Sequence, residues 1–135
     1  MSAIHKVMIV LAMVVAPAWA DAKPPLHGVH EIDDAMLWVA LAIEISNQCD
    51  TIDPRTLKGL SVLYGLKSRA EKLGYTDAEI SAYVKSPEEK ARMRKRGEAY
   101  VRSRGLDPAQ PDNLCTLGQA EIARQSSIGR LLRER

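Results

Sequence analysis

The segment "AMLWVALAI" at residues 35–43 decides the fold class, because nine consecutive positions carry no charge. Around it, Ile32, Met36, Val39 and Ile43 recur three or four residues apart, which is the period of one helix face. Other large apolar residues cover the remaining sides, and a helix that is apolar nearly all round normally lies at the centre of a bundle. Nine residues are too few to cross a bilayer, which needs about 20. We therefore expect a central helix over residues 31–48.

Capping residues place further helices on the C-terminal side of this segment. Asp53 can cap a helix with Pro54 at its first position, and Gly74 can end that helix. The apolar stripe of this helix consists of Leu60, Leu63, Leu66, Ala70 and Leu73. The sequences "TDAE" at 76–79 and "SPEE" at 86–89 each start another helix, the first as a capping box and the second with proline at the first position. No segment is predicted as a strand. The pattern indicates an all-α protein, a small bundle of four to five helices.

A final helix is expected from residue 112 or 113 to about residue 133. Its apolar and small residues form a single stripe with steps of four, four, four, three and three: Leu114, Gly118, Ile122, Ser126, Gly129 and Leu132. Three of the six are small, which predicts that another helix comes close to this one.

The first twenty residues have the pattern of a secretory signal peptide. Lys6 provides a positive charge, residues 7–15 are apolar, and the small residues Ala18 and Ala20 suit cleavage after Ala20. The alternative, a retained membrane anchor, is disfavoured because the uncharged stretch is short for a span. We expect a periplasmic protein with a signal peptide at 1–20, a flexible lead-in at 21–30 and a single helical domain at 31–135, without a transmembrane segment in the mature chain.

The charge balance of the mature chain excludes some default partners. Loss of Lys6 leaves 18 basic residues against 17 acidic ones, a formal charge of +1. Such a balance predicts neither nucleic acid nor a strongly anionic membrane as the partner.

The two cysteines, Cys49 and Cys115, are interpreted through the export signal. In an oxidising compartment, an even number of thiols is first taken as a disulfide. Closing a loop of about 66 residues is worth roughly 4 kcal/mol in the chain-entropy model. No C-x-x-C redox motif occurs and zinc would need two further ligands. A free reactive thiol at Cys115 stays as the alternative, although a nucleophile would need a positioned histidine.

Several motifs together resemble an uncharacterised family of short exported bacterial helical proteins, a domain of unknown function. They are "C-x-x-I-x-x-R", "LGYTDAEI", "EEKARMRKRGEAY" and "LC-x-x-G-x-x-EI-x-x-x-S-x-IGRLLR", which together extend over residues 42–133. The resemblance implies a periplasmic, helical protein. It implies no activity, and it supplies no catalytic residues.

A cluster of imidazoles and carboxylates near the N-terminus is the weak candidate for a metal site. His27 and His30 lie beside Glu31, Asp33 and Asp34. The two histidines are separated by a glycine in a segment that we expect to be mobile, so a solvated lead-in with an aspartate capping the first helix is the preferred interpretation. We predict no metal and no cofactor.

The segment 85–104 holds eight basic residues against three acidic ones, and residues 21–50 show the opposite, six acids against one lysine. The basic side chains Arg92, Arg94, Lys95 and Arg96 form a possible interaction face for an acidic partner or an envelope component. The preferred interpretation is a solvated helix face that partly offsets the acidic N-terminal segment.

No pattern of catalytic residues is recognised. The chain has no G-x-S-x-G elbow and no glycine-rich phosphate loop, and Glu79 and Glu121 are candidates for glycoside chemistry only because they are glutamates. We expect a disulfide-stapled binding or interaction module for an unknown periplasmic protein or envelope component. The alternative is a stress-type holdase chaperone that exposes apolar surface, and an enzyme is a distant third.

Overall fold

The computed structural model describes residues 23–135, which contain five α-helices, two short 3-10 helices and two three-residue strands. The expected all-α class is therefore confirmed, with a small sheet in addition. The predicted signal peptide and cleavage after Ala20 lie outside the described residues. The elements in chain order are η1 (Leu26–Gly28), α1 (His30–Gln48), β1 (Ile52–Pro54), α2 (Thr56–Lys72), α3 (Asp77–Lys85), α4 (Pro87–Ser103), α5 (Pro111–Arg124), η2 (Gly129–Leu131) and β2 (Leu132–Glu134).

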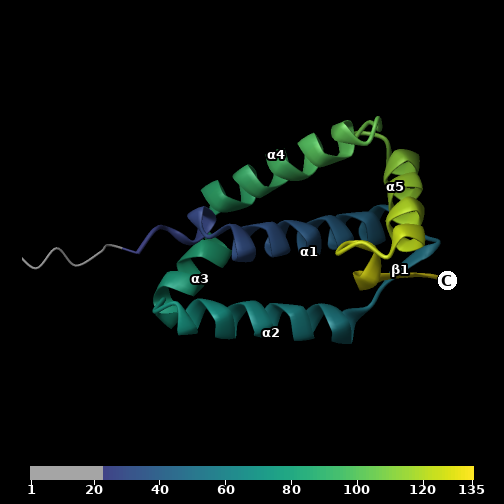
Figure 1. The fold of residues 1–135 in the computed structure, drawn as a ribbon. Helices are drawn as coiled ribbons and strands as arrows, with labels where there is room; N and C mark the ends of the chain where they lie inside the picture. Colours follow the sequence, from purple (N-terminus) through teal and green to yellow (C-terminus); the bar gives the residue numbers. More distant parts are fainter. Residues whose placement is uncertain (1–22) are drawn as a thin grey trace, which may run out of the picture.

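Helix α1 is the central element, as its apolar sequence predicts. It lies between α2 and α4, and α5 packs at its C-terminal end (Figure 1). Leu37, Leu41 and Ile45 are among its buried side chains. Helix α4 runs in the same direction as α1, whereas α2 runs in the opposite direction, and the short α3 connects the two outer helices (Figure 1). None of the helices in residues 23–135 is both long enough and apolar enough to cross a membrane.

The helix starts predicted at Thr76 and Ser86 and the helix end predicted at Gly74 are confirmed. The main-chain N–H of Glu79 donates to Thr76 Oγ1 at 3.2 Å, and the N–H of Thr76 donates to Glu79 Oε2 at 2.7 Å, which completes the capping box of α3. Ser86 Oγ accepts from the N–H of Glu89 at the start of α4, with Pro87 at the first position. Gly74 follows α2 with a φ of 92°, a conformation that glycine adopts without strain.

The disulfide between Cys49 and Cys115 is present, so the predicted cross-link is confirmed. It joins Cys49, which directly follows α1, to Cys115 in the second turn of α5, with the two Cα atoms 5.2 Å apart. Cys49 is buried in the largest apolar cluster of the protein, together with Ile45, Ile52 and Leu117. The cross-link therefore fixes α5 to the central helix across the core.

The C-terminal prediction is wrong beyond residue 124. Helix α5 ends at Arg124, and Gln125 has a left-handed φ of 50°. The chain then folds back over α5, where Ser126 donates its N–H to the carbonyl oxygen of Glu121 at 3.2 Å. A Cβ on Gly129 would lie 1.9 Å from that oxygen, so glycine at 129 permits a close approach of the turn to α5 rather than a helix–helix contact.

The prediction that the chain contains no strands is also wrong. Strands β1 and β2 pair antiparallel, with Ile52 opposite Glu134 and Pro54 opposite Leu132. Asp53 and Pro54 therefore belong to β1 rather than capping the next helix, and α2 begins at Thr56. Three-residue strands are too short to show the alternation from which a strand is recognised in sequence. Asp53 instead pairs with Arg135 at 2.9 Å, which holds the C-terminus on the sheet.

The expected flexible lead-in is also corrected where the structure describes it. Leu26 in η1 is buried against Ile32, Ala70 and Tyr75, and the Tyr75 hydroxyl donates to the carbonyl oxygen of Pro24. Burial of one leucine side chain is worth roughly 1.5–3 kcal/mol. Residues 23–29 thus belong to the packed domain.

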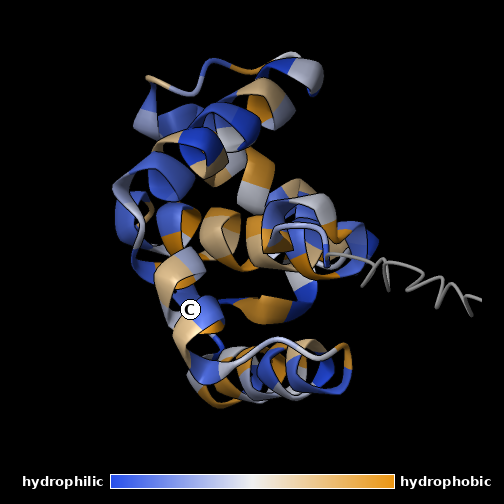
Figure 2. Cartoon of the chain, turned by 90° about the vertical axis from the view of Figure 1, so that its left-hand side faces the viewer, coloured by the Kyte–Doolittle hydropathy of each residue, from blue (hydrophilic) through white to orange (hydrophobic). Residues whose placement is uncertain are grey.

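Helix α2 packs less closely than its predicted stripe implies. Of the expected inward residues Leu60, Leu63, Leu66, Ala70 and Leu73, the structure buries Ala70 alone. Leu57 and Tyr64 on the same helix are 84% and 71% exposed. Figure 2 shows α2 at the bottom of the molecule, with hydrophobic positions on more than one side of the helix. Its apolar surface exceeds what the other elements of residues 23–135 cover.

Two helical glycines provide a test of packing. We expect Gly118→Ala to lower the free energy of unfolding by about 1–3 kcal/mol, because an added Cβ would lie 2.6 Å from both Ile45 Cγ2 and Ile52 Cδ1. A Cβ added at Gly65 in α2 would have no atom within 4 Å. Gly65→Ala is therefore expected to raise the free energy of unfolding by about 0.5–1 kcal/mol through helix propensity. Urea unfolding of both variants measures the difference, and equal effects would contradict the close approach at Gly118.

Candidate functional site

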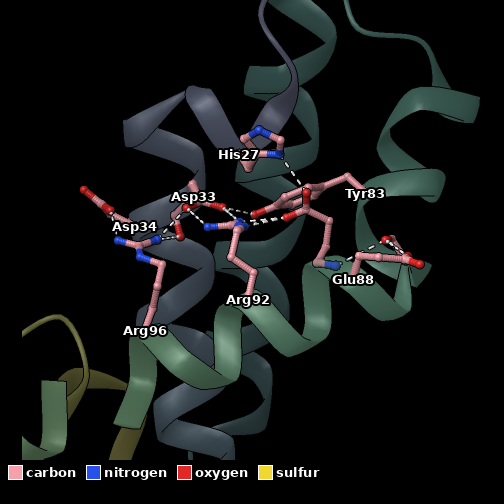
Figure 3. A network of polar contacts seen from close by, with 9 residues as sticks. His27, Asp33, Asp34, Tyr83, Glu88, Arg92 and Arg96 are labelled. Carbon is pink, nitrogen blue, oxygen red and sulfur yellow. Dashed lines mark hydrogen bonds and ion pairs between the residues drawn. The ribbon is translucent and has the colours of Figure 1, made fainter. Parts of the chain in front are cut away.

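A buried carboxylate, Asp33, organises the N-terminal end of the bundle (Figure 3). It lies in the first turn of α1 and is 3% exposed. Tyr83 of α3 donates its hydroxyl to Asp33 Oδ1 at 2.7 Å, and Arg92 of α4 donates from Nη1 to Oδ2 at 2.9 Å. Arg96, one turn further along α4, pairs with both Asp33 and its neighbour Asp34. We call Asp33, Tyr83, Arg92 and Arg96 the Asp33 cluster.

The electrostatics of this cluster indicate a clamp between helices rather than a catalytic group. Burial by itself raises the pKa of Asp33, but the hydrogen bonds from Arg92 and Tyr83 and the charges of Arg92 and Arg96 outweigh it, so the pKa lies below its usual value. The pKa of Tyr83 is raised, first by burial and then by its bond to Asp33. Each oxygen of Asp33 accepts two hydrogen bonds, Oδ1 from Tyr83 and Arg92 and Oδ2 from Arg92 and Arg96, which uses the acceptor positions of the carboxylate.

A second buried carboxylate, Glu121 of α5, has a similar structural role. Its side chain is inaccessible to solvent, Tyr100 of α4 donates to Oε1 at 2.7 Å, and Arg124 donates to both oxygens at 2.7 Å. Burial raises its pKa, and hydrogen bonds from Ser126, Tyr100 and Arg124 lower it further than burial raises it. Trp38 of α1 contacts the Tyr100 ring edge-on at 5.3 Å. Glu121, a candidate only as a glutamate in the sequence, thus links α5 to α4.

The predicted basic face is divided by the structure into two pairs. Arg92 and Arg96 point toward α1 and pair with Asp33, which agrees with the interpretation that basic and acidic segments offset each other. Arg94 and Lys95 are exposed and form no ion pair with any residue from 23 to 135. A possible interaction face on α4 therefore retains two of its four predicted residues.

The structure separates the two histidines proposed as weak metal candidates. His27 lies in η1 and its Nδ1 is 2.7 Å from Glu89 Oε1, whereas His30 is the exposed first residue of α1. Within residues 23–135, no group of three or more His, Cys, Asp or Glu side chains is arranged to hold a metal ion. His27 instead connects η1 to α4.

An apolar hollow between α1, α2 and α3 has the size and lining of a binding site. We call it the α2 groove; its volume is about 460 Å³, within the range of ligand pockets. Met36 and Ile43 of α1, Leu63 of α2 and Val84 of α3 contribute to its lining. Lys67 is the single charged residue of that lining, and its ammonium group pairs with Glu71 and Asp77 at 2.9 and 3.2 Å.

Sequence reasoning identified the residues of this groove but not its openness. The stripe along α2 was predicted, and a stripe alone does not reveal whether a helix lies against its neighbour or stands off from it. Leu57 and Tyr64, apolar or aromatic residues outside that stripe, were the available signal, because they give α2 more such surface than one contact face needs.

A family model matches residues 24–133, which is most of the chain and includes α1 to α5. The chain belongs to the Family of unknown function (DUF5333). The resemblance drawn from the cysteine, capping and C-terminal motifs is thereby confirmed. No curated protein and no solved structure matches the chain. DUF5333 membership brings no activity with it, so the function has to be argued from the grooves and charges described above.

Proposed function

We propose that this DUF5333 protein is an exported interaction module, and that the α2 groove takes an amphipathic helix of a partner protein. The observation that carries the proposal is the unfilled apolar surface between α1 and α2: Ile43 is 50% exposed and Leu60 is 44% exposed on the two sides of the groove. Exposed apolar surface that is concentrated in one place marks an interaction site.

A helix is the occupant that suits this groove. The lining residues on α1 and α2 recur at helical spacing, such as Met36, Ala40 and Ile43, so a third helix can pack along both as in a bundle. Exposed Leu57 extends the apolar surface of α2 beyond the groove, which favours a protein partner over a small molecule. Export is supported by the N-terminal sequence and by the disulfide, which an oxidising compartment maintains.

The holdase alternative would require the core to loosen in mild acid. The pKa values of Asp33 and Glu121 both lie below their ordinary values, so both carboxylates stay ionised and paired in mild acid. These pairs therefore oppose opening at pH 5 to 6. An unchanged near-UV circular dichroism spectrum at pH 5 is the result expected of the interaction module.

Site-specific photo-crosslinking tests the groove. A photoreactive phenylalanine analogue replaces Tyr64 at the groove or Gln119 on the exposed side of α5, in cells that export the protein. We expect one discrete protein adduct from position 64 and none from position 119. Ile43→Asp should lower the yield of the adduct from position 64 at least tenfold, because a carboxylate would have to be desolvated against an apolar helix.

The result has a clear counterpart. Ile43 is half exposed, so Ile43→Asp is expected to leave the folded state intact, and circular dichroism of the variant checks this. Equal adducts from positions 64 and 119, or an adduct that Ile43→Asp leaves unchanged, would contradict the groove as the binding site.

A further inference from the structure

A second hollow lies beside α1, on the side that faces α4 rather than α2. It is formed by α1 and α4, has a volume of about 470 Å³, and is floored by Leu37, Leu41 and Met93. We call it the α4 groove. Ala40 of α1 lines both grooves, so the two hollows adjoin along one face of the central helix. A helix laid over Ala40 would have α2 on one side and α4 on the other.

The two grooves differ in charge. Lys90 and Arg94 line the α4 groove one helical turn apart, about 6 Å along the axis. Neither forms an ion pair with any other residue in the described part of the chain, whereas the next cations on the same helix, Arg92 and Arg96, are held by Asp33. The edge of the concave face at α4 therefore carries two available positive charges.

The acidic residues of the same groove do not cancel these charges. Glu98 pairs with Arg102 at 3.5 Å, and Glu44 accepts a hydrogen bond from Gln48 at 3.2 Å. Because α1 and α4 run parallel, both glutamates lie toward the C-terminal ends of their helices, and Lys90 and Arg94 lie nearer the N-terminal end of α4. The groove is thus positive toward the N-terminal end of α4, negative at Glu44 toward the opposite end, and apolar along its floor.

We infer that the partner helix carries acidic residues one turn apart on the flank that faces α4, where they pair with Lys90 and Arg94 while its apolar stripe fills the α2 groove. This inference rests on the proposed function and names the chemistry of the partner. Charge pairs at the edge of an apolar contact contribute more to partner choice and association rate than to affinity. The partner is accordingly an acidic amphipathic helix, not a basic or a purely apolar one.

Two model peptides test the inference on the mature protein. Each is an 18-residue amphipathic helix with a leucine stripe, and they differ only in having glutamate or lysine on both flanks, so that the direction of binding does not matter. Fluorescence anisotropy of the labelled peptides at low salt is expected to give about tenfold tighter binding of the glutamate peptide. The difference should shrink at 0.5 M salt, where exposed charges are screened.

Charge reversal assigns the preference to the two residues. Lys90→Glu with Arg94→Glu is expected to abolish or invert the ratio between the peptides. Lys58→Glu with Lys72→Glu changes the net charge by the same amount at exposed positions outside both grooves, and should leave the ratio within twofold. A ratio that is unaffected by the first pair, or reduced equally by both pairs, would overturn the inference.

The failure of the proposed function has a different signature. If Ile43→Asp abolishes binding of both peptides while Lys90→Glu with Arg94→Glu has no effect, the groove stands and the acidic partner is wrong. If neither peptide binds, or if Ile43→Asp has no effect on binding, the groove itself is wrong. Sedimentation of the protein alone tests whether a second copy of the chain fills the groove. A dimer that Ile43→Asp dissociates would identify that occupant and overturn the inference.

Discussion

Cys49→Ser with Cys115→Ser is expected to lower the free energy of unfolding by about 4 kcal/mol. The cross-link spans 66 residues, and its loss restores to the unfolded chain the freedom of a long loop. The net stability of a domain is typically 5–15 kcal/mol, so the variant loses a large part of it. Urea unfolding followed by far-UV circular dichroism measures the change.

The native protein with a reductant provides the matched control. Reduced wild-type protein should unfold at nearly the same urea concentration as the double variant. A serine hydroxyl at the buried position 49 adds only a small polar cost, because Thr51 Oγ1, 3.2 Å from Cys49 Sγ, can serve as its hydrogen-bond partner. Alkylation of the denatured, unreduced protein should label neither cysteine. A loss below 1 kcal/mol would show that the sheet and the contacts of α5 with α1 hold the C-terminal region without the disulfide.

The features that the sequence predicted correctly are those fixed by local chemistry or by covalent constraint. A capping box at Thr76 and a proline after Ser86 specify a helix start through hydrogen bonds only three residues apart. The run of uncharged residues in α1 similarly requires burial on several sides. The disulfide followed from the compartment and from the number of thiols, without knowledge of the fold.

The features that were missed depend on contacts between distant residues. The β1–β2 pairing joins residues about eighty positions apart and is only three residues long, so no periodicity reports it. Gly129 was assigned to a helix stripe because its partner, the carbonyl oxygen of Glu121, becomes its neighbour only after the chain turns at Gln125. Burial of Asp33 depends on α3 and α4 arriving from fifty to sixty residues away.

The candidate site shows the same division. The opposite charges of residues 21–50 and 85–104 were apparent in the sequence. The sequence did not show which of the cations would form ion pairs with the acidic segment. Arg92 and Arg96 differ from Lys90 and Arg94 only in the side of α4 on which they lie, and the direction of that helix relative to α1 decides which side meets Asp33. Tertiary structure thus decides which cations of α4 stay without an ion pair among residues 23–135.

Asp33→Ala is expected to lower the free energy of unfolding at pH 7 by about 3 kcal/mol, the lower end of the range for removing one member of a buried ion pair. The lower end applies because Arg92 and Arg96 are about one-third exposed and recover part of their hydration. Tyr83 also loses its acceptor. Asp34→Ala is the matched control, since Asp34 is 44% exposed and its single ion pair should be worth less than 1 kcal/mol.

The effect of Asp33 should disappear in acid. Its pKa is lower in the folded protein than in the unfolded chain, so its contribution is complete above the unfolded value of about 4 and is lost as the pH falls through the folded value. Urea unfolding at pH 7, 5 and 3 is therefore expected to give a nearly constant difference between wild type and Asp33→Ala at the first two pH values and a smaller one at pH 3. A cost no greater than that of Asp34→Ala, or a difference that grows toward pH 3, would contradict the clamp, because an ionised carboxylate held by two guanidinium groups loses its advantage only when it takes up a proton.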